Sequence, residues 1–277
     1  MTEAVKIVTL INIMLVIVLM LSGSIGGWLG ESIYYLAVII SMLFCNAASD
    51  KLKYTRDVAN GLVEDYKLYF EFDRKRLGKL LPLVAPIVSI VFLTSLISAL
   101  ILSLVGIKST PVENQGLVTM LLVHAVLPAI LEEVMFRYIP LRLLEPYSKR
   151  WCVIYSAICF ALIHCNFAQM PYAFVAGALF MLVDISLDSI WPSLILHFIN
   201  NATSVIWIKY CSDTTATIVF ISILSIFTLV SLMFIYRKRN DYKVILKDSF
   251  DKGEAMPFIY APFALAAICC YVAAASI

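Results

Sequence analysis

Residues 117–141 read LVTMLLVHAVLPAILEEVMFRYIPL, an apolar run long enough to cross a bilayer that nevertheless carries Glu132, Glu133 and Arg137. An ionised carboxylate at membrane depth costs roughly 2.5–3.5 kcal/mol on insertion scales. Two adjacent carboxylates beside an arginine therefore indicate either a functional site or a buried charge network within a membrane helix.

The rest of the chain shares this apolar character. Of its 277 residues, 62% are hydrophobic and 14% are charged, against about 45–50% and about 25% in soluble domains. We therefore predict an all-α polytopic helical bundle, a single integral membrane domain over residues 1–277. The net charge of +2 gives no support to a nucleic-acid partner, and the lipid bilayer is the expected surrounding. The first apolar run lacks the pattern of a cleavable signal and predicts a retained helix.

The chain contains nine apolar runs whose lengths are close to that of a membrane-spanning helix, about 20 residues. Apart from Lys6 and the charges of residues 117–141, the one Asp, Glu, Lys or Arg within these runs is Asp184. The count falls to eight if the sixth run is short or re-entrant. The predicted spans are residues 6–24, 33–49, 80–105, 117–141, 151–167, 172–187, 191–208, 216–236 and 257–277.

Lys and Arg concentrate in three of the intervening segments, residues 50–79, 142–150 and 237–256. With nine crossings these segments fall on one side, and the opposite loops carry only Lys108 and Lys209. The positive-inside rule then predicts a cytoplasmic N-terminus and an external C-terminus in a cell membrane. Apolar residues recur at near-helical spacing within 50–79, which fits an amphipathic surface helix as well as a solvated loop.

Helical geometry separates the roles of the two glutamates. Glu133 and Arg137 are four residues apart, share a helix face and can form an ion pair. Glu132 points about 100° away from Glu133 and is left free to act as a general base. The alternative is a charge network that only holds neighbouring helices together.

Two further motifs follow on the next helices, and the chain holds only three histidines. Phe160 precedes His164 by four residues, and His197 precedes Asn201 by four, so each pair shares a helix face. A histidine and an amide on one face can stabilise an oxyanion, although either also serves to join membrane helices. At about 1.5 Å per residue, Glu132 and these polar side chains lie roughly 10–20 Å below the cytoplasmic surface and can meet in one cavity.

In this order, the three motifs resemble the CAAX-protease and bacteriocin-processing family of intramembrane endopeptidases, which includes the CAAX prenyl protease type II. The family shows Glu-Glu-x-x-x-Arg, Phe-x-x-x-His and His-x-x-x-Asn on successive helices. In this chain they are residues 132–137, 160–164 and 197–201. The resemblance covers about residues 117–208, the expected catalytic core, and the flanking helices carry no matching motif.

The resemblance implies hydrolysis of a peptide bond inside the membrane. In the family's proposed mechanism, the first glutamate and the first histidine activate a water, roles that fall on Glu132 and His164. The second histidine and the asparagine, His197 and Asn201, would hold the oxyanion. Supporting roles fall on the remaining motif residues, Glu133, Arg137 and Phe160.

Zinc is a second possibility, because Glu132, His164 and His197 form a His₂Glu set suited to a catalytic zinc ion. The chain has no His-Glu-x-x-His motif, and its seven cysteines show no metal-type CxxC spacing. We therefore favour a metal-independent, glutamate-dependent hydrolase without a cofactor.

The expected substrate is a membrane-bound or hydrophobic peptide, such as a leader, a bacteriocin precursor or a prenylated tail. A non-catalytic immunity or scaffold protein of the same fold is the main alternative. A proton-relaying transporter is less favoured, because the sequence shows no internal repeat. Among residues outside the motifs, Asp188 is expected either to help cap the helix after it or to be solvated. Tyr34 is expected to be an interfacial anchor.

Overall fold

The computed structural model describes residues 14, 17, 32–40, 72–106, 115–138, 141, 149–164 and 166–242. Every regular element in these ranges is helical, which confirms the predicted all-α fold. The long helices are α4 (Arg74–Leu104), α8 (Lys149–Ile163), α9 (Met170–Leu187), α10 (Trp191–Tyr210) and α11 (Thr214–Arg237). Residues 32–40 are also helical. The predicted spans 257–277 and, apart from Met14 and Ile17, 6–24 lie outside the described residues.

Four helices of the described part are long and apolar enough to cross a membrane. They are α4, the helix Leu117–Tyr138, α9 and α11, while Cys152–Ile163 of α8 is a shorter apolar helix. The protein is therefore an integral membrane protein. Among the predicted spans that the structure describes in full or nearly so, 151–167 forms a shorter apolar helix and 191–208 is not among these four, so the described part holds slightly fewer spans than were predicted for it.

Helix α4 begins six residues earlier than the predicted span 80–105. Asp73 adopts an extended backbone conformation, and its side chain accepts a hydrogen bond from the Lys75 amide at 2.8 Å. This N-cap satisfies an amide at the start of the helix that has no partner within it. The basic residues that follow Asp73 therefore belong to α4 and not to a loop.

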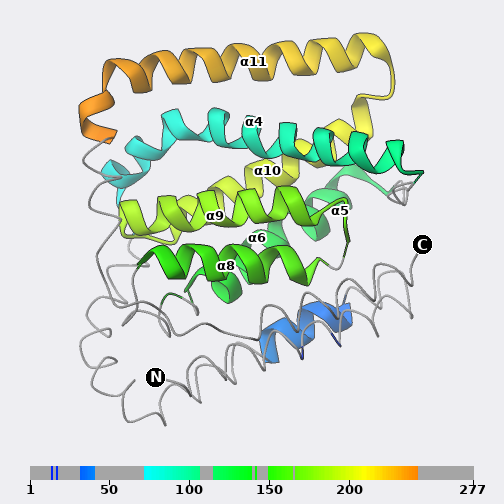
Figure 1. The fold of residues 1–277 in the computed structure, drawn as a ribbon, viewed down its shortest axis with the longest axis horizontal. Helices are drawn as coiled ribbons and strands as arrows, with labels where there is room; N and C mark the ends of the chain where they lie inside the picture. Colours follow the sequence, from blue (N-terminus) through cyan, green and yellow to red (C-terminus); the bar gives the residue numbers. More distant parts are fainter. Residues whose placement is uncertain are drawn as a thin grey trace.

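Helix α9 lies between α8 and α4, and α11 packs on the far side of α4 (Figure 1). The closest approach is at Gly177 of α9, where an added Cβ would lie 2.9 Å from the Ala157 Cα and 3.3 Å from the Phe160 Cδ1. Glycine therefore sets the spacing of α8 and α9. The buried core extends from this contact toward the second half of the helix Leu117–Tyr138, where Met135 and Phe136 are buried.

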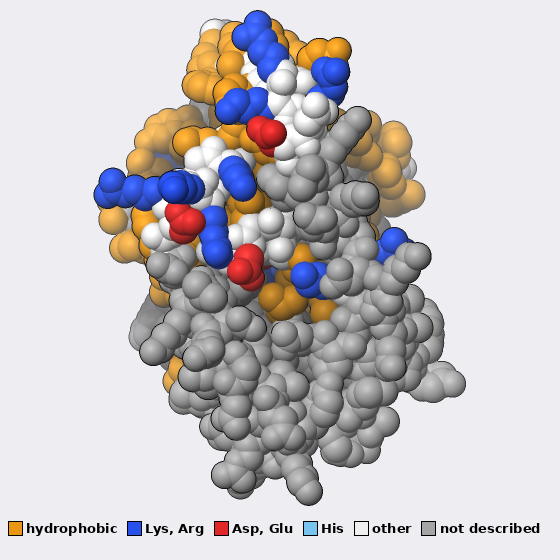
Figure 2. All heavy atoms as spheres, turned by 90° about the vertical axis from the view of Figure 1, so that its left-hand side faces the viewer, with side chains coloured by type: hydrophobic (Ala, Val, Ile, Leu, Met, Phe, Trp, Pro, Cys, Tyr) orange, Lys and Arg blue, Asp and Glu red, His pale blue; other side chains and the backbone are white. Residues whose placement is uncertain are grey.

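Basic side chains gather at one end of the bundle. The starts of α4 and α8 and the end of α11 lie at this end (Figure 1). Figure 2 looks onto this end and shows Lys and Arg side chains gathered on it. Lys209, by contrast, lies near the opposite end and donates a hydrogen bond to the Gln115 carbonyl at 3.0 Å. The asymmetry agrees with the predicted segregation of charge, while the side that faces the cytoplasm stays a prediction. The basic residues are Arg74, Lys75, Arg76, Lys79, Lys149, Arg150, Arg237, Lys238 and Arg239.

Candidate active site

The glutamates lie on a helix that departs twice from α-geometry. The continuous helix Leu117–Tyr138 consists of α5 (Leu117–Leu121), the π-helical turn η1 (Leu122–Val126), α6 (Leu127–Glu133) and a second π-turn, η2 (Val134–Tyr138). Pro128 is the second residue of α6, one residue after η1 is complete, and proline can neither donate a hydrogen bond to the preceding turn of a regular helix nor fit against it without a clash. Single π-turns inside helices occur frequently at functional sites.

The second π-turn is held by a neighbouring helix. A widened turn changes which backbone amide each carbonyl meets, so a carbonyl can be left without an intrahelical partner. The buried Ser156 hydroxyl of α8 donates a hydrogen bond to the Phe136 carbonyl within η2. Serine therefore fixes the position of the segment that carries Arg137.

The predicted ion pair between Glu133 and Arg137 is present. Arg137 Nε lies 3.2 Å from Glu133 Oε2, and both side chains are completely buried. The Arg137 guanidinium also stacks over the Phe160 ring, with its Cζ 4.4 Å from the ring centroid. Such cation–π contacts are strongest when desolvated. The charge pair is therefore part of the packed interior and is not reached from the surface.

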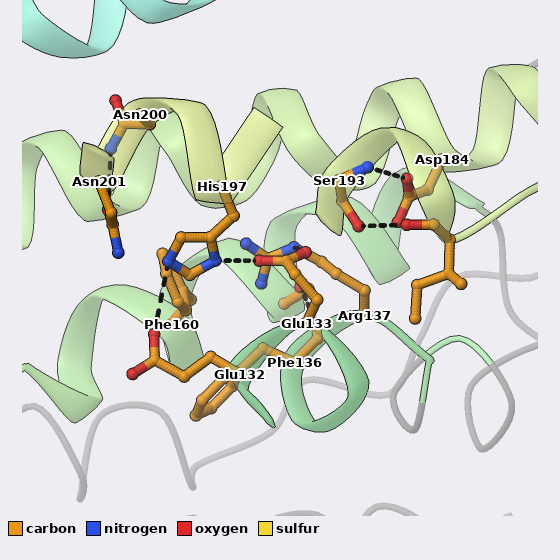
Figure 3. Close-up of polar contacts among 12 residues, drawn as sticks. Glu132, Glu133, Phe136, Arg137, Phe160, Asp184, Ser193, His197, Asn200 and Asn201 are labelled. Atoms are coloured by element: carbon orange, nitrogen blue, oxygen red, sulfur yellow. Dashed lines mark hydrogen bonds and ion pairs between the residues drawn. The ribbon is translucent and has the colours of Figure 1, made fainter. Parts of the chain in front are cut away.

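His197 lies between the two glutamates (Figure 3). Its Nδ1 donates to Glu133 Oε1 at 2.6 Å, and its Nε2 lies 3.8 Å from Glu132 Oε2. Glu133 and His197 are 64 residues apart in the sequence, on α6 and α10. The charge pair of the first motif thereby orients the histidine of the third, and Glu132 faces the other ring nitrogen.

The Phe160 ring contacts the rings of three other residues of the site. It makes edge contacts with His164, His197 and Phe136, at centroid distances of 5.0, 5.6 and 5.6 Å. His164 Nδ1 bonds the Phe160 carbonyl at 2.7 Å. A carbonyl can only accept, so Nδ1 carries the hydrogen, and Nε2 of the neutral ring is left as an acceptor.

Asn201 lies one turn beyond His197 on α10 (Figure 3). Its Oδ1 accepts a hydrogen bond from the Asn200 Nδ2 at 3.2 Å. Because the oxygen of the Asn201 amide is engaged in this way, its NH₂ group remains to donate to another molecule. Asn200, which is 8% exposed, was not predicted as a site residue, because it was expected to face away from Asn201.

The start of α10 is capped by α9. Asp184, which is completely buried, accepts a hydrogen bond from the Ser193 amide at 2.8 Å. Of the two roles expected for Asp188, the structure shows a largely exposed side chain and not a cap on α10. Asp188 instead ends α9 in a left-handed conformation (φ 49°) and contacts Arg76 on α4. A carboxylate on the preceding helix thus fixes the position of α10, four residues before His197.

Tyr34 is not the interfacial anchor that its position near a span end predicted. It is only 9% exposed, packs in the hydrophobic core and hydrogen-bonds the Glu132 side chain. The helix of residues 32–40 therefore supplies a contact to the first motif from outside the predicted catalytic core of 117–208. Tyr34 belongs to no motif, and its place in an apolar run gave no sequence signal for this role.

The alternative zinc set does not fit the observed arrangement. Across the described ranges, no three His, Cys, Asp or Glu side chains are placed to hold a metal ion. Within the set Glu132, His164 and His197, the polar contact of His164 is to the Phe160 carbonyl, while His197 lies between Glu132 and Glu133.

The segment that carries these motifs matches a protein family, described as type II CAAX prenyl endopeptidase Rce1-like, over residues 114–203. The matched segment is about a third of the chain and is similar to this family. The match includes every motif residue from Glu132 to Asn201 and confirms the resemblance that the motifs indicated. The Rce1-like family is a family of CAAX proteases. No curated protein and no solved structure matches the chain.

Proposed function

We propose that the protein is an intramembrane endopeptidase that hydrolyses a peptide bond of a membrane-associated or hydrophobic peptide. The observation that carries this proposal is the buried arrangement of Glu132, Glu133 and His197 within an apolar helical bundle. Burying such groups is expensive unless they are paired, and membrane proteins keep them mainly where they function. The Rce1-like match over residues 114–203 supports the same reaction class.

In this proposal Glu132 and His164 activate the attacking water. Glu132 is the carboxylate outside the ion pair, and 11% of its side chain remains exposed. His164 presents Nε2 as an acceptor, because its Nδ1 is committed to the Phe160 carbonyl. A carboxylate and a neutral imidazole are both suitable for removing a proton from water.

His197 and Asn201 stabilise the oxyanion in the same proposal. Asn201 has a free NH₂ group once its oxygen accepts from Asn200, and amide donors are common components of oxyanion holes. His197 donates from Nε2 in the protonated form of its ring. Glu133 and Arg137 act as positioning residues, because Glu133 holds His197 Nδ1 and Arg137 holds Glu133.

The proposal is tested by the substitution Glu132→Gln, which keeps the size of the side chain and removes its basicity. The full chain and the variant are expressed in a strain lacking the gene, and the termini of membrane peptides are compared by mass spectrometry. Asp241→Asn, an acid-to-amide change at an exposed position, is the matched control. We expect a new terminus with the wild type and the control and none with Glu132→Gln.

Cleavage by Glu132→Gln at the wild-type level would contradict the glutamate-dependent mechanism. If wild type and variant are equally well inserted but no terminus differs between them, the non-catalytic immunity or scaffold role would replace it. Loss of activity with a chelator, restored by zinc, would reopen the metal-dependent alternative.

We also propose that the basic end of the bundle faces the cytoplasm of a cell membrane. The concentration of Lys and Arg at that end supports this orientation through the positive-inside rule. Cysteines introduced at Lys238 and Lys209 test it, since these positions lie at opposite ends of the bundle. In intact cells an impermeant maleimide should label Lys209→Cys and spare Lys238→Cys; the reverse pattern would contradict the orientation.

A further inference from the structure

A groove separate from the candidate active site runs along α4 on the lipid-facing side of the bundle. It lies between α4, α10 and α11, and its volume is ≈ 670 Å³. Helix α4 contacts both of the other helices, whereas α10 and α11 make few contacts with each other. On α10 the groove is lined by Ile199, which is two residues from His197 and so faces about 200° away from it.

The groove is apolar along its length and basic at one end. Arg74 lines it at the start of α4, and Phe220 lines it from the start of α11, at the opposite end of the bundle. Phe220 also packs on Trp207 at a centroid distance of 5.3 Å. Along α4, Arg74 and Val88 are about 21 Å apart at about 1.5 Å per residue. This exceeds half of a hydrocarbon core about 30 Å thick, the depth of one leaflet.

Helix α11 depends on this region for little of its own packing. None of its residues is buried. Two hydrogen bonds join it to α4, one between Ser89 Oγ and Thr228 Oγ1 at 2.6 Å and one from Thr228 Oγ1 to the Ala85 carbonyl at 3.3 Å. A chain-like apolar molecule in the groove would therefore contact α11 on a face that the described residues leave open.

We propose that this groove binds one acyl chain of an anionic phospholipid, whose headgroup phosphate lies at Arg74. The apolar walls suit an acyl chain, and the basic end lies where the headgroup of a lipid in that leaflet would be. Basic pockets between membrane helices bind the headgroups of anionic lipids in the same manner. The neighbouring residues Lys75 and Lys238 give the same end a broader positive field.

Two substitutions, each with a matched control, distinguish lipid binding in the groove from a general attraction of lipid to the protein surface. Gly78 lines the groove, and a Cβ added there meets nothing within 4 Å, so Gly78→Phe fills the space without displacing the helix. Arg74→Gln removes the charge from the groove, and Lys75→Gln removes a neighbouring charge that does not line it. Leu93→Phe adds an aromatic ring on an exposed face of α4 outside the groove.

The experiment is native mass spectrometry of the purified full chain in detergent, titrated with palmitoyl-oleoyl phosphatidylglycerol or phosphatidylcholine. We expect one tightly bound phosphatidylglycerol, preferred over phosphatidylcholine by about fivefold, which is the effect of roughly 1 kcal/mol for one basic side chain at the headgroup. Arg74→Gln should remove the preference, Gly78→Phe should remove the bound lipid, and both controls should behave as the wild type.

Equal binding of the two lipids by the wild type would overturn the proposal. So would an equal loss of preference in Lys75→Gln and Arg74→Gln, since the charge would then act diffusely. A neutral prenylated peptide that displaces phosphatidylglycerol equally from the wild type and from Leu93→Phe would also overturn it, because the groove would then prefer another occupant. Because the readout is lipid binding, the result is independent of whether the chain is a protease.

Discussion

The buried pair of Glu133 and Arg137 makes a strong quantitative prediction. The two side chains are 0% exposed and their charged atoms lie 3.2 Å apart. The substitution Arg137→Gln leaves Glu133 buried with the hydrogen bond from His197 and removes the stacking on Phe160. Removal of one partner of a buried pair costs about 3–5 kcal/mol, because the other charge remains desolvated. We expect a loss of that size in the free energy of unfolding.

The measurement is unfolding of the purified protein in mixed micelles by titration with a denaturing detergent, followed by circular dichroism. Arg76→Gln is the matched control, since Arg76 also pairs with carboxylates, those of Asp73 and Asp188, but its side chain is 29% exposed and theirs are 38% and 71% exposed. Exposed pairs contribute about 0–1 kcal/mol, so the control should change stability by no more than that.

A double-mutant cycle separates the pair from other effects of the substitution. Glu133→Gln should also destabilise the protein, because Arg137 is then buried without its partner. The double variant should cost less than the sum of the two single variants by about 1–3 kcal/mol. Additive losses, or an Arg137→Gln effect no larger than that of Arg76→Gln, would refute the assignment of a desolvated ion pair.

Three further predictions concern residues that position the site. Gly177→Ala should lower both activity and the free energy of unfolding, the latter by about 1–3 kcal/mol, because the added Cβ would lie 2.9 Å from the Ala157 Cα and push α9 away from α8; unchanged activity and stability would contradict the close approach. Asp184→Ala should lower the free energy of unfolding by about 0.5–2 kcal/mol through loss of the cap on α10, measured by the same titration. Asn200→Ala should reduce kcat with little change in KM, since Asn201 loses the contact that orients its amide; an unchanged kcat would show that Asn200 has no such role.

The site combines contacts that the sequence indicates with contacts that it does not. The ion pair of Glu133 with Arg137 follows from a spacing of four residues on one helix, and the structure contains it. The hydrogen bond of Glu133 to His197 joins residues 64 positions apart and has no local signature. The same holds for Tyr34, which lies outside every motif and contacts Glu132 from another helix.

Errors in the sequence analysis came from contacts between helices. Asp188 stands at the expected distance before α10, yet Asp184, from within α9, accepts the hydrogen bond from the Ser193 amide. The choice depends on how α9 and α10 are oriented, which spacing alone does not give. The zinc hypothesis was reasonable from ligand types, but whether three ligands converge on one point depends on the rotation of three helices.

The sequence by itself determined the membrane class, the all-α fold, the position of the charged motif and the pairing of Glu133 with Arg137. These properties follow from hydropathy and from the periodicity of a single helix, both of which are local to a stretch of chain. Only the tertiary structure decided that His197 is held by Glu133, that Ser156 holds the second π-turn and that a groove opens between α4, α10 and α11. Such contacts depend on the depth, rotation and spacing of packed helices, which many side chains set together.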